Sequence, residues 1–268
     1  MIENFPKHIV EPVVLAESES FLVKLAKNHE EVEMAQRLRY EVFNIEQERG
    51  LKSAKKYGID FDEFDEQCLH LLAIEKSTEK LVGTYRAHLG SVANSAKGFY
   101  SSKEYEIHGL YKIADKCLEL GRTCVSLEYR SGAVIALLWT GITELLVRGN
   151  FSYMLGCVSL DEADPRTGWA VYQYIAGKNS TCKDFNVIPR PGFKLEKPDQ
   201  REIDAILSDE KALRKKIPPI FKGYLRLGGV ICGDPALDTE FGTIDFFILV
   251  EVDKIPPRYK RYFNYRNP

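Results

Sequence analysis

Apolar residues recur along this chain at the spacings of helices and of strands. Between residues 30 and 46 they fall three or four positions apart, which is the spacing of an amphipathic helix. Polar residues separate shorter apolar runs, and such runs predict strands. These runs lie at 21–26, 68–74, 81–89, 118–125 and 152–159, and the second and third of them form a predicted hairpin.

The second half of the chain alternates between strands and helices. An apolar stripe from Ile135 to Leu146 predicts a helix soon after the strand at 118–125. Another helix is expected at 165–176, with Asp164 as its N-cap. We also expect a loop at 90–103, a helix at 103–115, a helix at 199–216 and closing strands within 241–250. This order indicates an α/β fold with an antiparallel first half.

No Pro-, Gly- or Ser-rich linker divides the chain of 268 residues. We therefore expect an N-terminal arm at residues 1–20 and one domain at 21–268. Residues 177–217 are polar and contain prolines. They are interpreted as an insertion or a lid-like connection within that domain.

Charge and cysteine content narrow the class of protein. The chain has 37 basic and 39 acidic residues, a net charge of -2, so no global field attracts it to nucleic acid. Residues 214–226 and 258–266, however, contain no acidic residue and read either as a solvated rim or as docking surfaces. Six scattered cysteines without a C-x-x-C pair indicate a reducing, cytoplasmic setting. Neither a secretory signal nor a membrane-spanning run is recognisable.

The strand LELGRTCV at 118–125 carries two charges in an apolar run. Alternation along a regular strand would put Glu119 and Arg122 on opposite faces. Gly121 between them marks a position where a β-bulge would bring both to one face. One interpretation is that these charges form structural ion pairs with partners elsewhere in the chain. The other is that Glu119 is a partly desolvated carboxylate that accepts a proton during catalysis.

A short Ser-Gly turn at 131–132 precedes the helix after this strand. A helix start of this kind presents free backbone N–H groups to a phosphate ester, and Arg130 would add a cation. The chain has neither a P-loop nor G-x-G-x-x-G, and an ordinary capped helix is the alternative interpretation.

The segment IDFDEFDEQCLH places Asp60, Asp62 and Asp65 ahead of a strand. It is either a solvated acidic turn or a cluster that receives an ammonium group or a cationic partner. The five histidines lack metal-binding spacing, so no metal is expected. His70 and His88 are interpreted as structural residues.

Together these residues resemble the GNAT superfamily of N-acyltransferases. Within it, the chain is similar to the ornithine-lipid synthases, often labelled haemolysin-like, which are related to the homoserine-lactone autoinducer synthases. The resemblance implies an α/β fold with a mixed, largely antiparallel central sheet, flanking helices and splayed central strands. The segments that carry it include LRYEVF (38–43), FDEFDEQCLHLL (61–72), VGTYR (82–86), LELGRTCV (118–125), YRSGAVIALLW (129–139), KGYLRLGG (222–229) and FGTIDFFILV (241–250).

By position, the resemblance implies roles for eleven residues. Glu119 matches the general base, and Arg122 joins it in the catalytic set. The substrate-binding set is Arg39, Asp62, Asp65 and Arg86. The donor phosphate would be bound by Arg130, Ser131, Gly132, Ala133 and Val134.

Two departures from the family pattern stand out. Gly132 comes one place earlier than the glycine of the usual GNAT phosphate loop. Ser126-Leu127 stands where the ornithine-lipid branch commonly has His-Pro. The first departure leaves the phosphate contacts open, and the second leaves the amino acid open among ornithine, glycine and lysine.

The implied reaction moves a fatty acyl group, such as a 3-hydroxyacyl group, to the α-amine of an amino acid and gives a lyso-aminolipid. No tightly bound cofactor is expected. The co-substrate is the phosphopantetheine thioester of acyl carrier protein, preferred over coenzyme A. The expected partners are acyl carrier protein, the amino acid and the inner membrane face, but no nucleic acid. The alternatives are a haemolysin-like membrane-interacting protein and a non-catalytic acyl or carrier-protein binding module.

Overall fold

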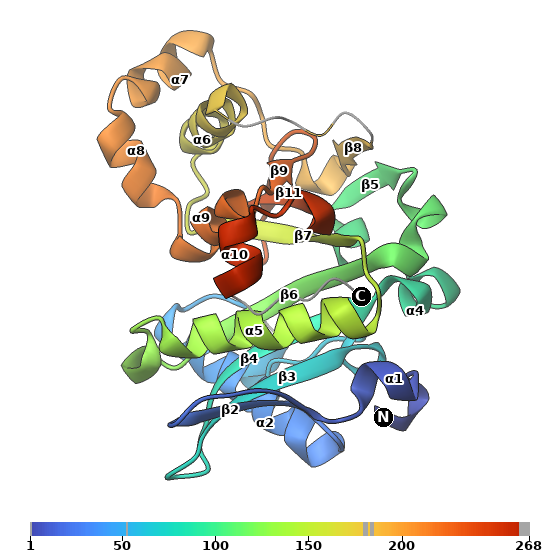
Figure 1. The fold of residues 1–268 in the computed structure, drawn as a ribbon. Coiled ribbons are helices and arrows are strands. Elements are labelled where there is room, and N and C mark those ends of the chain that lie inside the picture. The colour runs from blue at the N-terminus through green and yellow to red at the C-terminus, as the bar shows by residue number, and fades with distance from the viewer. Residues whose placement is uncertain (1, 52, 179–181, 183–184, 263–268) are drawn as a thin grey trace. The chain divides into compact units, whose positions relative to one another are not determined.

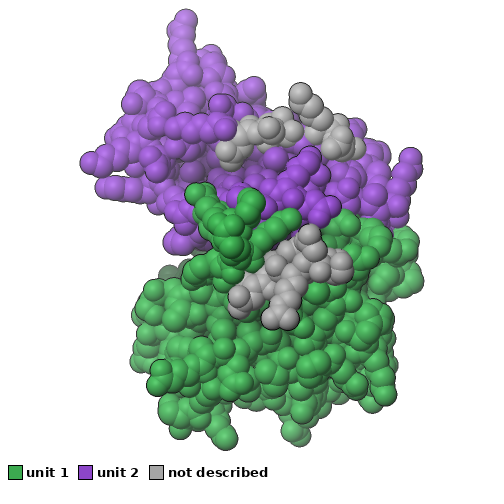
Figure 2. Space-filling view, in the orientation of Figure 1, with its two compact units in different colours: residues 1–97, 115–152, 257–268 green, residues 98–114, 153–256 purple. Residues whose placement is uncertain are grey.

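The computed structural model describes residues 2–51, 53–178, 182 and 185–262. The chain divides into two compact units (Figure 2). Unit 1 comprises residues 1–97, 115–152 and 257–268, and unit 2 comprises residues 98–114 and 153–256. Two compact units do not decide how many domains the chain has, so one domain at 21–268 stays a prediction.

Unit 1 is built on five antiparallel strands (Figure 1). Each strand pairs with the next one along the sheet, and the register shifts once in the β1–β2, β3–β4 and β4–β6 pairs. In spatial order they are β1 (Val14–Glu17), β2 (Phe21–Leu25), β3 (Leu69–Glu75), β4 (Leu81–Leu89) and β6 (Cys117–Val125).

Two helices cover the opposite faces of this sheet. On β3, Leu72 packs in one buried cluster with Val32 of α2 (His29–Arg39). Its neighbour Leu71 instead approaches Gly141 of α5 (Ala133–Arg148), which lies in front of the strands in Figure 1. Because adjacent strand residues point to opposite faces, α2 and α5 lie on opposite sides of the sheet.

Helix α2 starts where the sequence supplies a cap and continues into a different winding. The Asn28 side chain accepts a hydrogen bond of 3.0 Å from the Glu31 backbone N–H, as an N-cap does. From Tyr40 to Glu46 the helix widens into a π-helical segment. Unit 1 also contains α1 (Lys7–Val10), α3 (Ala54–Tyr57), α4 (Gly90–Ser95) and α10 (Pro257–Tyr262).

Unit 2 also contains antiparallel strands that pair with one another. These strands are β7 (Tyr153–Leu160), β11 (Thr243–Glu251) and β10 (Ala236–Asp238), and β9 (Val230–Ile231) also pairs with β11. A separate ribbon joins β5 (Tyr105–His108) to β8 (Asn186–Pro189). The helices are α6 (Pro165–Lys178), α7 (Gln200–Leu207), α8 (Glu210–Lys216) and α9 (Pro219–Arg226). Aromatic contacts such as Phe221 with Phe246, 5.3 Å between ring centres, fill the core.

The α/β class with largely antiparallel strands and flanking helices is confirmed. The β3–β4 hairpin, the β6 strand with its following helix α5, and α6 also lie where the sequence predicts them. The splaying of central strands stays a prediction, as does the insertion at 177–217, of which residues 179–181 and 183–184 lie outside the described residues.

Three local predictions were wrong. The helix expected at 103–115 is strand β5 with short 3-10 turns, because Tyr105 and Ile107 are buried and alternate with exposed neighbours. The single helix expected at 199–216 is instead the two helices α7 and α8. The Asp209 side chain caps α8 by accepting a hydrogen bond of 2.9 Å from the Ala212 backbone N–H. The loop expected at 90–103 contains α4. Across the described ranges, no helix is both long and apolar enough to cross a membrane.

Candidate active site

Strand β6 has a bulge where its two charges stand. Thr84 of β4 lies opposite Cys124, and Arg86 lies opposite Gly121, so two steps along β4 match three along β6. Arg122 adopts the left-handed region with a φ of 52°. The bulge was expected at Gly121, and it does put Arg122 on the face of the sheet that carries Arg86.

Arg39, at the end of α2, forms the centre of a buried ion network on this face. It is 1% exposed, and its Nε donates to Oδ1 of Asp60 over 3.0 Å. Its Nη1 and Nη2 donate to the two carboxylate oxygens of Asp65, over 3.1 Å and 2.6 Å. This bidentate geometry is the strong form of an arginine–carboxylate pair. Gln36 adds a 3.0 Å bond to Asp65.

Arg86 and Arg122 complete the network. Arg86 Nη1 donates to Oδ1 of Asp62 over 2.7 Å and to Oδ1 of Asp65 over 2.8 Å. Arg122 pairs with Asp60, and its guanidinium lies 4.8 Å from the centre of the Phe43 ring. Three guanidiniums thus meet three carboxylates, so the sequence-predicted acidic segment receives cations of the chain itself.

The network keeps the carboxylates of Asp62 and Asp65 ionised. Burial by itself would raise the pKa of Asp65, but the guanidiniums of Arg39 and Arg86 outweigh it and hold that pKa far below its ordinary range. Burial likewise opposes ionisation of Asp62, and Arg86 overcomes it, so the pKa of Asp62 is also lowered. Oδ2 of Asp62 is buried and has no hydrogen-bond partner among the described residues.

Glu119 lies on the same face, directly opposite His88 of β4. The carboxylate is 4% exposed and the imidazole 2% exposed. Nδ1 of His88 is 3.4 Å from Oε2 of Glu119. His70, by contrast, places Nε2 2.9 Å from the Asp65 carbonyl oxygen, and its burial lowers its pKa to about 4. His70 is therefore a neutral structural residue, as the sequence predicted.

The predicted donor loop leads into α5. Gly132 has a φ of 105°, which favours glycine, and Val134 is buried against Gly83 of β4. Ser131 and Ala133 are exposed, beside the first N–H groups of a helix, which have no partner within it.

Arg130 is already engaged. Its Nε donates to the Val125 carbonyl over 2.8 Å, and its two Nη atoms bind the Glu46 carboxylate over 2.5 Å and 2.7 Å. The guanidinium is therefore fixed at the end of β6, a few residues before α5 begins, and it forms an ion pair with Glu46.

The six charged residues that the resemblance implied thus lie on the same side of the sheet. The loop residues 130–134 follow strand β6. Asp60 was not among the predicted site residues, although it lies in the predicted acidic segment. The pairing of His88 with Glu119 was not predicted either. Alternation could have found it, since His88 stands two residues after Arg86 and hence on the same face.

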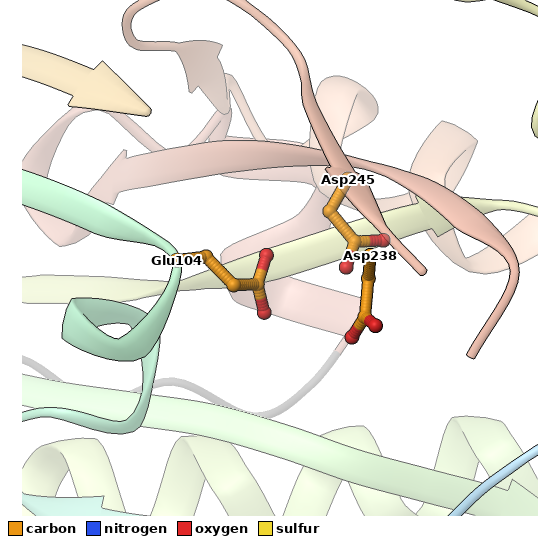
Figure 3. Close-up of side chains that lie close together, drawn as sticks. All are labelled: Glu104, Asp238 and Asp245. Carbon is orange, nitrogen blue, oxygen red and sulfur yellow. The ribbon is translucent and has the colours of Figure 1, made fainter. Parts of the chain in front are cut away.

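A second acidic cluster lies in unit 2 (Figure 3). One carboxylate oxygen from each of Glu104, Asp238 and Asp245 lies within 4.8 Å of the other two, and the three residues are buried. Such a set is able to bind a metal ion or to share protons. Burial raises the pKa of Asp245 to about 6 and raises the pKa of Glu104 well above its ordinary range. This cluster was not predicted from the sequence, because its three residues are far apart along the chain.

The acidic cluster makes stability depend on pH. Between about pH 4 and pH 6 the folded state holds a proton on Asp245 that the unfolded state has lost, so the free energy of unfolding falls as pH rises. We expect Asp245→Asn to flatten this slope, which is up to about 1.4 kcal/mol per pH unit. Urea unfolding at several pH values measures it, with the exposed Asp234→Asn as control. An unchanged slope in Asp245→Asn would contradict the assignment.

Known acyltransferases are similar to this chain over most of its length. Residues 38–140 match the model of the acetyltransferase (GNAT) domain. An L-ornithine N(alpha)-acyltransferase of Brucella abortus is 33% identical over 94% of this chain and 91% of its own length. One of Agrobacterium fabrum is 33% identical over 90% and 84%. A solved CoA-dependent acyl-homoserine lactone synthase shares 15% identity over 87% of this chain and 83% of its own, with a TM-score of 0.46.

A sequence identity of 33% over most of both chains shows that this chain and these acyltransferases belong to one family. The predicted resemblance to GNAT acyltransferases of the ornithine-lipid type is confirmed. The chain is an N-acyltransferase and belongs to the family of L-ornithine N(alpha)-acyltransferases.

Proposed function

We propose that the protein transfers a fatty acyl group from the thioester of acyl carrier protein to the α-amine of ornithine. The N–C bond of the amide forms, the C–S bond of the thioester breaks, and the thiol leaves with a proton. The observation that carries the proposal is Glu119, a buried carboxylate on a strand that runs toward a helix start. The names of the relatives support ornithine as the amino acid.

Glu119 is proposed as the general base. An amino acid carries its α-amine as an ammonium group at neutral pH, and the nitrogen attacks only after losing a proton. A carboxylate that is 4% exposed accepts this proton in surroundings where charge interactions are strong. Arg122, held on the same face by Asp60, is proposed to orient the reacting groups.

The ion network is proposed to form the amino-acid side of the site. Arg39, Asp65 and Arg86 hold one another in place through short bonds. Asp62 is fixed by Arg86 but retains an oxygen without a hydrogen-bond partner among the described residues. A carboxylate oxygen of this kind suits an ammonium group of the substrate.

The start of α5 is proposed to bind the phosphate of phosphopantetheine. Exposed Ser131 and Ala133 flank Gly132, and the free N–H groups and the helix dipole favour a negative charge there. Arg130 would add its cation, in competition with Glu46.

Ala133→Asp tests this donor site. An aspartate in the first turn stabilises a helix, so a loss of donor binding would not reflect unfolding. We expect the KM for the thioester donor to rise about tenfold or more, because a like charge near a protein surface costs ~1–4 kcal/mol. The neutral Ala133→Asn serves as control. An unchanged donor KM in Ala133→Asp would place the phosphate elsewhere.

Acyl carrier protein is proposed as donor partly because of the basic run at the end of α8. Arg214, Lys215 and Lys216 are exposed, and carrier proteins are typically acidic, so the charges are complementary. The basic run 258–266 is proposed to contact the inner membrane face, although its residues 263–266 lie outside the described residues. The buried free thiols Cys68 and Cys124 agree with a cytoplasmic, reducing setting.

A substrate matrix tests the proposal. Purified protein is assayed with ornithine, lysine or glycine against a 3-hydroxyacyl donor on carrier protein or on coenzyme A. We expect kcat/KM to be highest for ornithine with the carrier-bound donor, and the carrier preference to weaken with salt. A preference for glycine would overturn the assignment of ornithine as the acceptor. Equal use of both donors at low salt would overturn the assignment of acyl carrier protein as the donor.

A further inference from the structure

His88 and Glu119 form a cross-strand pair in the buried face of the unit 1 sheet. They lie opposite each other in the β4–β6 register, with 3.4 Å between Nδ1 and Oε2. This distance is a few tenths of an ångström longer than an ordinary hydrogen bond. Contacts of catalytic groups are often longer before the substrate binds.

The surroundings of this pair fix the imidazole ring. Phe64 is 2% exposed, and its ring meets the His88 ring edge-on at 6.0 Å between centres. The ring therefore contacts the buried Phe64 ring, while its Nδ1 faces the Glu119 carboxylate.

The other titratable and charged groups around the pair keep one charge state. Burial raises the pKa of Cys68 far above its ordinary range and that of Cys117 to about 12, so both thiols stay neutral. The arginine network keeps Asp62 and Asp65 ionised, and Arg86 is cationic. These surrounding groups therefore keep their charge as the pH changes between about 5 and 9.

We propose that His88 is the positioning residue for the general base: its Nδ1–H donates to Oε2 of Glu119 and turns Oε1 toward the substrate amine. The inference rests on the proposed role of Glu119. A neutral imidazole has one N–H, whereas a carboxylate only accepts. The pair therefore fixes both the tautomer of His88 and the orientation of Glu119.

Two substitutions separate positioning from packing. His88→Leu fills a similar space without a donor, and His88→Asn keeps an N–H near the position of Nδ1. We expect His88→Leu to lower kcat about tenfold to hundredfold, as misplaced reacting groups do, with KM values little changed. The acidic limb of its pH–kcat/KM profile moves to higher pH, because a lost hydrogen bond disfavours the ionised carboxylate. We expect His88→Asn to keep most of the wild-type kcat and to keep the acidic limb of the pH–kcat/KM profile near its wild-type position.

A packing role alone would not give this pattern. His88→Leu with kcat within about twofold of wild type, or His88→Asn as impaired as His88→Leu with an unshifted profile, would overturn the proposal. Glu119→Gln is measured in parallel. If it keeps wild-type turnover, the general base is wrong, whereas an inactive Glu119→Gln beside an unaffected His88→Leu overturns only the role of His88.

A measurement on the unaltered chain covers the case in which His88→Leu does not fold. In nitrogen-15 NMR of histidine-labelled protein, we expect His88 to carry its proton on Nδ1 near neutral pH. The tautomer balance should shift in Glu119→Gln. A proton on Nε2 in the wild-type protein would overturn the proposal.

Discussion

Glu119→Gln should lower turnover at least about 100-fold, with the protein still folded. Glutamine keeps the shape of the side chain but cannot accept the proton of the substrate ammonium, and general bases typically contribute ~10²–10⁴ in rate. The carboxylate is 4% exposed and lies among polar groups of β4 and β6, so solvent does not easily replace it. Steady-state turnover with saturating donor and amino acid measures the effect.

The control for this substitution is Glu128→Gln. Glu128 follows the same strand but its side chain is 78% exposed, so its loss should leave turnover unchanged. Near wild-type turnover of Glu119→Gln at neutral pH would contradict the assignment of the base.

Arg39→Met should destabilise the fold by about 3–5 kcal/mol, the range for removing one partner of a buried ion pair. Methionine fills much of the space but leaves Asp60 and Asp65 without the guanidinium that bonds to both. Urea unfolding followed by circular dichroism measures the loss. The large cost comes from buried carboxylates, which are hard to keep charged when uncompensated.

Arg37→Met is the matched control on the same helix. Arg37 is 58% exposed and pairs with Glu33 one turn away, and such a surface pair contributes less than ~1 kcal/mol. Equal destabilisation by the two substitutions would mean that the ion network contributes little to stability.

The elements with strong local signals could be predicted from the sequence. Alternation found the β3–β4 hairpin, and the apolar stripe after Gly132 found α5. The helix expected at 103–115 failed because Tyr105 and Ile107 obey a two-residue period over only four positions. So short a run does not distinguish a strand from a helix.

The site was predicted in part. Gly121 correctly marked a bulge in β6, but the residue with positive φ is Arg122, a conformation that the sequence does not reveal. The acidic segment was a visible candidate for binding a cation. That its cations are Arg39, Arg86 and Arg122 depends on the packing of α2, β4 and β6. Such long-range pairs are set by tertiary structure, and so is the contact between His88 and Glu119.

The identity of the product tests the central claim most directly. Ornithine labelled with nitrogen-15 at the α-amine is incubated with the purified protein and a 3-hydroxyacyl donor, and the product is fragmented by mass spectrometry. We predict an amide that carries the label at the acylated nitrogen, and at least about 100-fold less of it with Glu119→Gln. Acylation at the side-chain nitrogen, or no acyl-ornithine at all, would contradict the account.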